Sequence, residues 1–235
     1  ATPPSNSASV PPSADRLAVT EPTINENGYL AAEGAPLGGT AAEEAMPPVD
    51  VVFVLGSPGS GKTTQCQMLA KHYGCQHFSP GELLRAEVQK ETSLGTRISN
   101  MIRAGQIVPA QVTLDLLKSA MRTSQGPYLI DGFPRSVDSL ETFERQCGKG
   151  TATIVFELQE EELTDRLLER GRTSGRTDDN AMTIQRRVQT FQMQSMPVVD
   201  VLVDQGNLHR IDASQPMDVV FTAARAVYEQ YFPSL

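Results

Sequence analysis

The stretch Gly56-Ser-Pro-Gly-Ser-Gly-Lys62-Thr63 decides how the rest of the chain folds. Residues 51–55, just before it, are apolar and mostly β-branched, which is typical of a buried parallel strand. In residues 63–73, which follow, apolar side chains recur at the spacing of a helix with one apolar face. A strand, a glycine-rich turn and a helix in this order predict a phosphate-binding loop.

The loop has the residue types that phosphate binding requires. Its glycines allow successive backbone N–H groups to turn toward a phosphate chain, and the start of the helix adds partial positive charge. Lys62 is placed to reach the terminal phosphates, and the hydroxyl of Thr63 or Thr64 is placed to bind Mg²⁺. The alternative is a glycine turn that only starts a helix, but the flanking strand and helix favour nucleotide binding.

The composition of the whole chain narrows the kind of protein that it can be. A length of 235 residues with 39% hydrophobic content suits one α/β domain with an appendage. The net charge of −8 argues against nucleic-acid and anionic-membrane partners, and no apolar run approaches the ~20 residues of a membrane span. Cys66, Cys75 and Cys147 have neither paired nor metal-ligand spacing, which favours a reducing compartment. We therefore expect a cytoplasmic protein, and we expect a monomer.

Residues 1–48 differ in kind from the rest. They are rich in Pro, Ala and Ser and hold eight of the 16 prolines, with Tyr29 as the one aromatic residue and Arg16 as the one basic residue. Such a segment buries too little apolar surface to offset the entropy of ordering, so we predict a disordered extension. It resembles neither a transit peptide nor a secretory signal, and its composition leaves its role open.

From residue 49 onward, expected strands and helices alternate. This pattern predicts a doubly wound, five-stranded parallel sheet. The expected strands are 51–55, 77–79, 128–131, 153–158 and 208–212. The expected helices are 63–73, 79–89 (with Ser79 as its cap), 94–103, 112–121, one ending near 146, 160–170, 180–204 (with a kink at Pro197) and 216–231.

Asp131 ends an apolar strand, so it should lie at the carboxyl edge of the sheet, where open α/β folds bind ligands. A carboxylate there could hold Mg²⁺, directly or through water, beside Lys62. The alternative role is a cap for the next helix.

Arginines form a second signal. Arg166 and Arg170 lie four residues apart on one expected helix and so point the same way. The others of interest are Arg85, Arg135, Arg176 and Arg187. Taken singly, each could be a surface residue paired with a glutamate. Phosphoryl transfer between two nucleotides, however, gathers about six negative charges, so together with Lys62 the arginines favour a cationic cleft.

Five stretches, taken together, resemble the short-lid nucleoside monophosphate kinases, which are the adenylate kinases and the UMP-CMP kinases. They are Gly56-Ser-Pro-Gly-Ser-Gly-Lys-Thr-Thr-Gln-Cys66, Gly81-Glu-Leu-Leu-Arg85, Gly105-Gln-Ile-Val-Pro109, Ile130-Asp-Gly-Phe-Pro-Arg135 and Glu169-Arg-Gly-Arg-Thr-Ser-Gly-Arg-Thr-Asp-Asp-Asn180. The resemblance covers about residues 51–232. It implies a P-loop kinase domain over 49–235, with a small helical insertion that binds the monophosphate at about 79–108 and a short lid at about 171–178.

The resemblance also implies roles for single residues. ATP would be bound by Gly59, Ser60, Gly61, Lys62, Thr63, Thr64, Arg166 and Arg170. The monophosphate would be bound by Pro80, Arg85, Ile102, Val108, Gly132, Arg135, Ser139, Arg176 and Arg187. The residues that act on the transferred group would be Lys62, Arg135, Arg170, Arg176 and Arg187. Asp178 and Asp179 would position lid arginines or cap the next helix, and Mg²⁺ would accompany ATP at Thr63 and Asp131.

Three positions depart from the family pattern. Thr63 stands where these kinases have glycine, Pro80 where they have Thr or Ala, and Ser139 where they have Gln for AMP or Asn for UMP and CMP. The implied activity is reversible transfer of the γ-phosphoryl group of ATP to a nucleoside monophosphate. We favour AMP narrowly, because that activity is widespread. The alternatives are a UMP-CMP kinase and, in another class, a catalytically inactive nucleotide-binding module.

Overall fold

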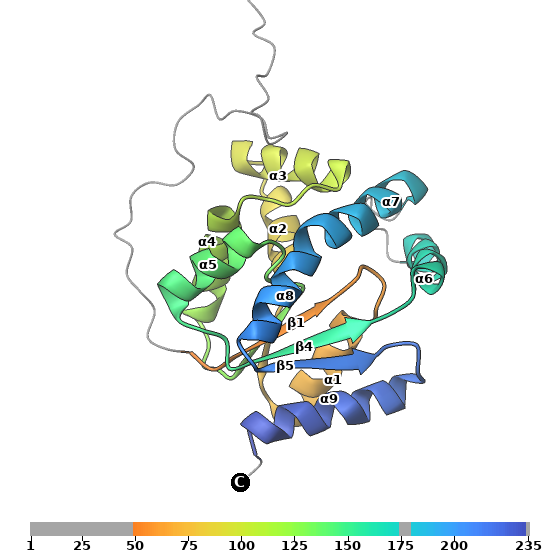
Figure 1. Ribbon diagram of the computed structural model, residues 1–235. Coiled ribbons are helices and arrows are strands. Elements are labelled where there is room, and N and C mark those ends of the chain that lie inside the picture. Colours follow the sequence, from red (N-terminus) through yellow and green to blue (C-terminus); the bar gives the residue numbers. More distant parts are fainter. Residues whose placement is uncertain (1–48, 174–179, 234–235) are drawn as a thin grey trace, which may run out of the picture. The chain divides into compact units, whose positions relative to one another are not determined.

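A computed structural model describes residues 49–173 and 180–233 of the chain. Its centre is a sheet of five parallel strands in the order β2-β3-β1-β4-β5 (Figure 1). The strands are β1 (Val51–Gly56), β2 (Gln76–Phe78), β3 (Tyr128–Asp131), β4 (Ala152–Glu157) and β5 (Leu208–Asp212). The predicted doubly wound parallel sheet is confirmed.

Helices cover both faces of the sheet because side chains alternate along each strand. Val51, Phe53 and Leu55 point to one face, which α4 (Ala110–Met121), α5 (Val137–Cys147) and α8 (Met196–Asp204) cover. The intervening side chains of β1 point to the other face, which α1 (Lys62–Tyr73) and α9 (Met217–Tyr231) cover. Figure 1 shows these two helical layers on either side of the strands.

A third, smaller core lies in the segment between β2 and β3. There α2 (Pro80–Val88) and α3 (Ser93–Ala104) pack on one side of α4. The buried residues of this core are Leu84, Ile98, Val108 and Val112. The segment 80–104 thus forms a helical insertion whose apolar side packs with residues 108 and 112.

Two elements differ from the sequence prediction by more than two residues. Helix α6 (Glu160–Thr173) runs three residues beyond its predicted end at Arg170, into the expected lid; residues 174–179 of that lid lie outside the described residues. The single helix predicted over 180–204 is instead α7 (Ala181–Thr190), a π-helical turn (Phe191–Ser195) and α8.

A π-helical turn comes just before Pro197, the residue at which the sequence predicted a kink. Proline has no N–H to donate within a helix, and here it stands in the first turn of α8, where no donor is needed. The widened turn comes just before it, with the Met196 N–H donating to the Phe191 carbonyl. Ser79 does precede α2, but its side chain makes no capping hydrogen bond. None of the helices described in the two ranges is long and apolar enough to cross a membrane.

Candidate active site

The sheet has its topological switch point at β1 and β3. These strands are neighbours, but α1 follows β1 onto one face whereas α5 follows β3 onto the other. A crevice therefore opens at their carboxyl ends, where open α/β sheets bind ligands. The glycine-rich loop begins at the end of β1, and Asp131 ends β3, as predicted.

The glycine-rich loop leaves the start of α1 available to an anion. Gly61 precedes the 12-residue helix with φ 82°, a left-handed conformation, and no side chain caps the helix. A Cβ atom on Gly59 would come within 3.1 Å of Leu167 Cγ and 3.2 Å of the Leu163 carbonyl oxygen. Gly59 also has φ 89°, so any other residue there would be strained in its backbone as well as crowded by α6.

Lys62 lies at the meeting point of several charges. Its residue surface is partly exposed, but its ammonium group is surrounded by protein and donates to the Ser57 carbonyl, 3.1 Å away. Burial lowers the pKa of Lys62 from 10.5 to about 8; Asp131 opposes this shift, and nearby guanidinium groups add to it. Those groups belong to Arg135, Arg187 and Arg170. The structure therefore brings four of the predicted cations into one electrostatic neighbourhood.

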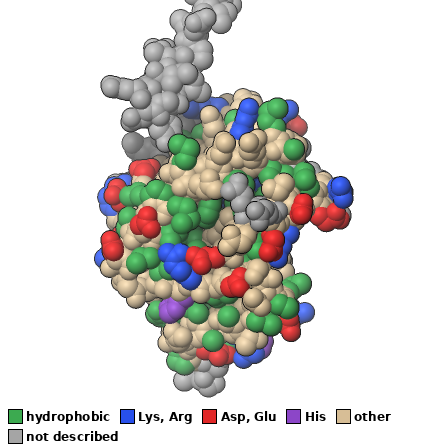
Figure 2. Space-filling model, turned by 45° about the vertical axis from the view of Figure 1, so that its right-hand side comes forward, with side chains coloured by type: hydrophobic (Ala, Val, Ile, Leu, Met, Phe, Trp, Pro, Cys, Tyr) green, Lys and Arg blue, Asp and Glu red, His purple; other side chains and the backbone are tan. Residues whose placement is uncertain are grey.

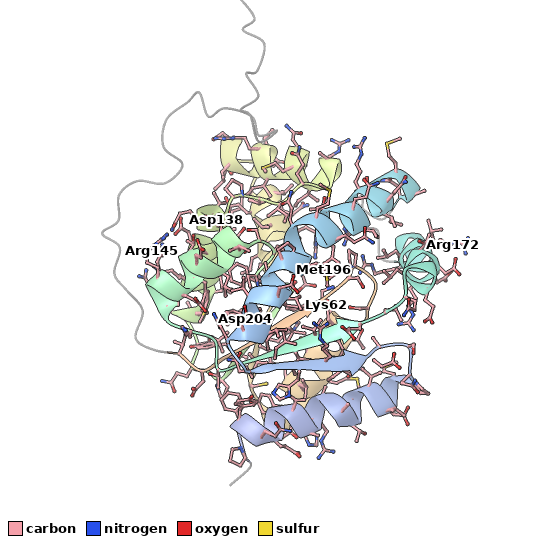
Figure 3. All side chains as sticks on the ribbon, viewed as in Figure 1. Lys62, Asp138, Arg145, Arg172, Met196 and Asp204 are labelled. Carbon is pink, nitrogen blue, oxygen red and sulfur yellow. The ribbon has the colours of Figure 1, made fainter. Side chains whose placement is uncertain are left out.

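Two arginines face the same space from different elements. A Cβ atom on Gly81 would lie 3.4 Å from Arg135 Nη2 and 3.5 Å from Arg85 Nη1. A Cβ atom on Gly132 would lie 3.5 Å from both Arg135 Nη2 and Lys62 Cε. The guanidinium groups and the lysine are thus gathered above the sheet edge. By contrast, Arg145 and Arg172 project away from the labelled Lys62 in Figure 3.

Asp131 is held as a carboxylate. The Thr63 hydroxyl donates to Asp131 Oδ2 at 2.5 Å, and His77 Nε2 lies 3.7 Å from the same oxygen. Burial opposes the charge, but the His77 ring, the Lys62 charge and the Thr63 hydrogen bond outweigh it and leave the pKa of Asp131 below 3.8. The next helix is capped by the Ser136 side chain, so the alternative role of Asp131 as a helix cap is wrong.

The residues around Asp131 fit a magnesium ion that binds together with phosphates. Asp131 Oδ1 is buried and has no hydrogen-bond partner within the described ranges. Those ranges hold no group of three or more His, Cys, Asp or Glu side chains that could enclose a metal. Mg²⁺ keeps several waters and typically takes one or two carboxylates besides phosphate oxygens. Asp131 and Thr63 could supply these few protein ligands.

A pocket that is partly open to solvent lies over this edge of the sheet. Many of the predicted site residues line it: Lys62, Pro80, Arg85, Ile102, Val108, Gly132, Arg135, Ser139 and Arg187. The sequence prediction missed Leu84 and Thr113, which also line it. A polar residue between Val112 and Leu114 on an otherwise apolar helix face was the available signal for Thr113. On the face in Figure 2, acidic and basic side chains are mixed.

The other predicted residues lie outside this lining. The Arg166 Nη1 atom donates to the Ala213 carbonyl at 3.2 Å, and the Arg166 guanidinium pairs with Glu162 at 3.3 Å. Gly59, Ser60, Gly61 and Thr63 belong to the loop and to the first turn of α1, and Thr64 is exposed. Arg170 acts on Lys62 through its charge. Arg176, Asp178 and Asp179 lie outside the described residues.

A family model described as adenylate kinase matches residues 54–207. The chain belongs to the adenylate kinase family. The UMP-CMP kinase of Lentinula edodes is 43% identical over 192 residues, which cover 76% of this chain and 85% of that protein. Adenylate kinase isoenzyme 1 of Homo sapiens is 41% identical over 184 residues, which cover 77% of this chain and 94% of that protein. UMP-CMP kinase 3 of Oryza sativa subsp. japonica is 43% identical over 185 residues, covering 78% and 87%. These matches confirm the predicted family; both of its named kinds are similar to the chain.

Proposed function

We propose that the protein is a nucleoside monophosphate kinase that transfers the γ-phosphoryl group of ATP reversibly to a nucleoside monophosphate. The observation that carries this proposal is the convergence of Lys62, Arg85, Arg135 and Arg187 on one pocket beside the phosphate-binding loop. Membership of the adenylate kinase family supports the same class, a phosphotransferase with a phosphate group as acceptor.

Catalysis then consists of alignment and charge neutralisation. The attacking atom is already an anionic phosphate oxygen, so no general base is required. Residues 59–64 would hold the phosphates of ATP, and Arg166 would stack on its base. Arg85 and Arg135 would hold the acceptor phosphate, and Arg170, Arg176 and Arg187 would neutralise the transferred group. Mg²⁺ on Asp131 and Thr63 would supply further positive charge to the phosphates of ATP.

The helical insertion and the lid would close over the two nucleotides and exclude water, which would otherwise compete as acceptor. Lid closure in adenylate kinases is a well-known example of this behaviour. In this protein α2 and α3 share one apolar core, so these two helices could move together. Thr190 Oγ1 donates to the Gly105 carbonyl at 3.1 Å and would link such a movement to α7.

The proposal also concerns which nucleoside monophosphate accepts the phosphoryl group. We favour AMP narrowly, with UMP and CMP as the alternative, since relatives with both kinds of name are similar to the chain. The test is ADP formation with AMP, UMP, CMP and dCMP as acceptors at fixed ATP and Mg²⁺. Rapid ADP formation with one of them supports the proposal and names the acceptor. Nucleotide binding without ADP formation would replace the kinase with an inactive binding module.

A further inference from the structure

Thr113 occupies a position where two cores meet. On α4, Val112 belongs to the small core of the insertion, whereas Leu114 belongs to the core on the sheet. Since successive residues of a helix turn by about 100°, the Thr113 side chain lies between these two directions. Ala110, which lies close to it on the same helix face, also lines the pocket. Thr113 thus faces the pocket, and only 8% of its surface is exposed.

The hydroxyl of Thr113 has no hydrogen-bond partner among the residues that the structure describes. A threonine in a helix usually donates to the carbonyl four residues back, as Thr96 does to Thr92 at 3.1 Å and Thr222 to Asp218 at 2.9 Å. Thr113 Oγ1 makes no hydrogen bond to any residue that the structure describes, although its own N–H donates to the Pro109 carbonyl. A hydroxyl that lines the pocket and has no protein partner can form a hydrogen bond with a ligand that enters the pocket.

The other hydroxyls of the pocket lining are already occupied. Ser139 donates to the Ser136 carbonyl at 2.7 Å and accepts from the N–H groups of Arg135 and Ser136, each at 3.0 Å. Thr190 and Ser195 also donate to backbone carbonyls. Ser139 is therefore committed to the start of α5, and it has no hydroxyl hydrogen left for a ligand.

We propose that Thr113, and not Ser139, recognises the acceptor base, through a hydrogen bond from its hydroxyl to the exocyclic group of the base. The inference rests on the proposed function, because it places the acceptor phosphate at the arginines and the base among Leu84, Ile102 and Val108. The exocyclic group is the part of a base that projects furthest from the sugar. A hydroxyl both donates and accepts, so it suits an amine as well as an oxygen.

The test combines Thr113→Val, which keeps the shape of the side chain, with acceptors that lack the exocyclic group. AMP is compared with purine riboside 5′-monophosphate, and CMP and UMP with 2-pyrimidinone riboside 5′-monophosphate. For the acceptor that the wild type uses best, the variant should raise KM and the calorimetric Kd about five- to tenfold at unchanged kcat. With the matching analogue, the wild type and the variant should bind alike.

The stability of the substrate-free variant separates recognition from a structural role. Thr113→Val removes an unpartnered hydroxyl, so thermal unfolding should occur at the same or a higher temperature. A lower unfolding temperature would contradict the proposal. Thr222→Val is the matched control, because it removes a helical hydroxyl on α9 that does not line the pocket; it should leave both constants unchanged.

The outcomes distinguish the inference from the function on which it rests. If the wild type forms ADP but Thr113→Val weakens an acceptor and its analogue equally, or weakens neither, the inference fails and the kinase stands. If no monophosphate yields ADP but the calorimetric difference depends on the exocyclic group, the inference stands and the kinase fails. If no monophosphate binds at all, both are overturned.

Discussion

The two ends of the pocket are built in different ways. At the charged end, Lys62 begins α1 after the loop that follows β1, and Arg135 lies in the turn that follows β3, so the sheet fixes their positions. At the apolar end, Leu84 lies on α2 of the insertion and Val108 lies just before α4, and both pack in a core separate from the two cores on the sheet. Arg85, on α2, reaches from the insertion toward the charged end.

This difference suggests separate roles for the two ends of the pocket. Groups fixed by the sheet would act on the phosphates that both nucleotides share, so their loss should stop the reaction with every acceptor. Groups on the insertion would contact only the monophosphate, so their loss should change acceptor recognition and leave ATP binding nearly intact. Substitutions at the two ends should therefore fail in distinguishable ways.

The largest effect is expected from Lys62→Met at the charged end. Because the lysine ammonium would neutralise phosphate charge as the group is transferred, we expect kcat to fall by about a thousandfold or more with every acceptor. The measurement is ADP formation in a coupled assay, with thermal unfolding to show that the fold survives. Lys71→Met, on the exposed side of α1, is the matched control. Retention of normal activity by Lys62→Met would remove the kinase assignment.

Arg85→Met should have the next largest effect and should be selective for one substrate. Loss of a guanidinium from the acceptor phosphate should raise the KM of the monophosphate by about a hundredfold. The Kd of ATP, measured by calorimetry, should change by less than about threefold. Arg97→Met, on exposed α3, serves as the control. An equal loss for both nucleotides would show that the two ends are not separate.

The lowered pKa of Lys62 predicts a pH dependence at the charged end. The protonated lysine attracts phosphate more strongly than the neutral one, so the affinity for ATP should fall as pH rises through about 8. ATP binding near pH 8.5 should take up a proton, seen as a buffer-dependent calorimetric enthalpy that Lys62→Met lacks.

The sign for stability follows from the same shift. Between about pH 8 and the ordinary value of 10.5, the unfolded chain binds more protons at Lys62 than the folded protein does, so the lysine makes stability rise with pH. Stability that falls across this window in the wild type relative to Lys62→Met would contradict the lowered pKa.

The charged end could be predicted from sequence because its residues lie in short strand-turn-helix motifs. Lys62, Asp131 and Arg135 each stand within a few residues of a strand end, and local chemistry places them. Thr113 could not be placed in this way. Whether a helical threonine bonds its own backbone or faces a cavity depends on how α4 is rotated between two cores.

The position of the π-helical turn was unpredictable for a similar reason. Pro197 indicates that the helix is irregular nearby. Tertiary packing decides where the widened turn forms, and here it forms at Phe191–Ser195. The role of Ser139 in capping α5, by contrast, could be predicted from the sequence. The pair Ser136 and Ser139 has the spacing of a capping box, and the structure forms that box at the start of α5.

Ser139→Ala has the smallest expected effect. It tests whether Ser139 stabilises α5 or recognises the acceptor base. The substitution leaves the Arg135 and Ser136 N–H groups without their acceptor, so the free energy of unfolding should fall by about 1 kcal/mol. Denaturant unfolding measures this loss, and Glu141→Ala, exposed on the same helix, is the control. Because the Ser139 hydroxyl makes its hydrogen bonds at the start of α5, the variant should still distinguish an acceptor from the analogue that lacks its exocyclic group. If that distinction were lost while stability remained unchanged, Ser139 would take the place of Thr113 as the residue that recognises the base.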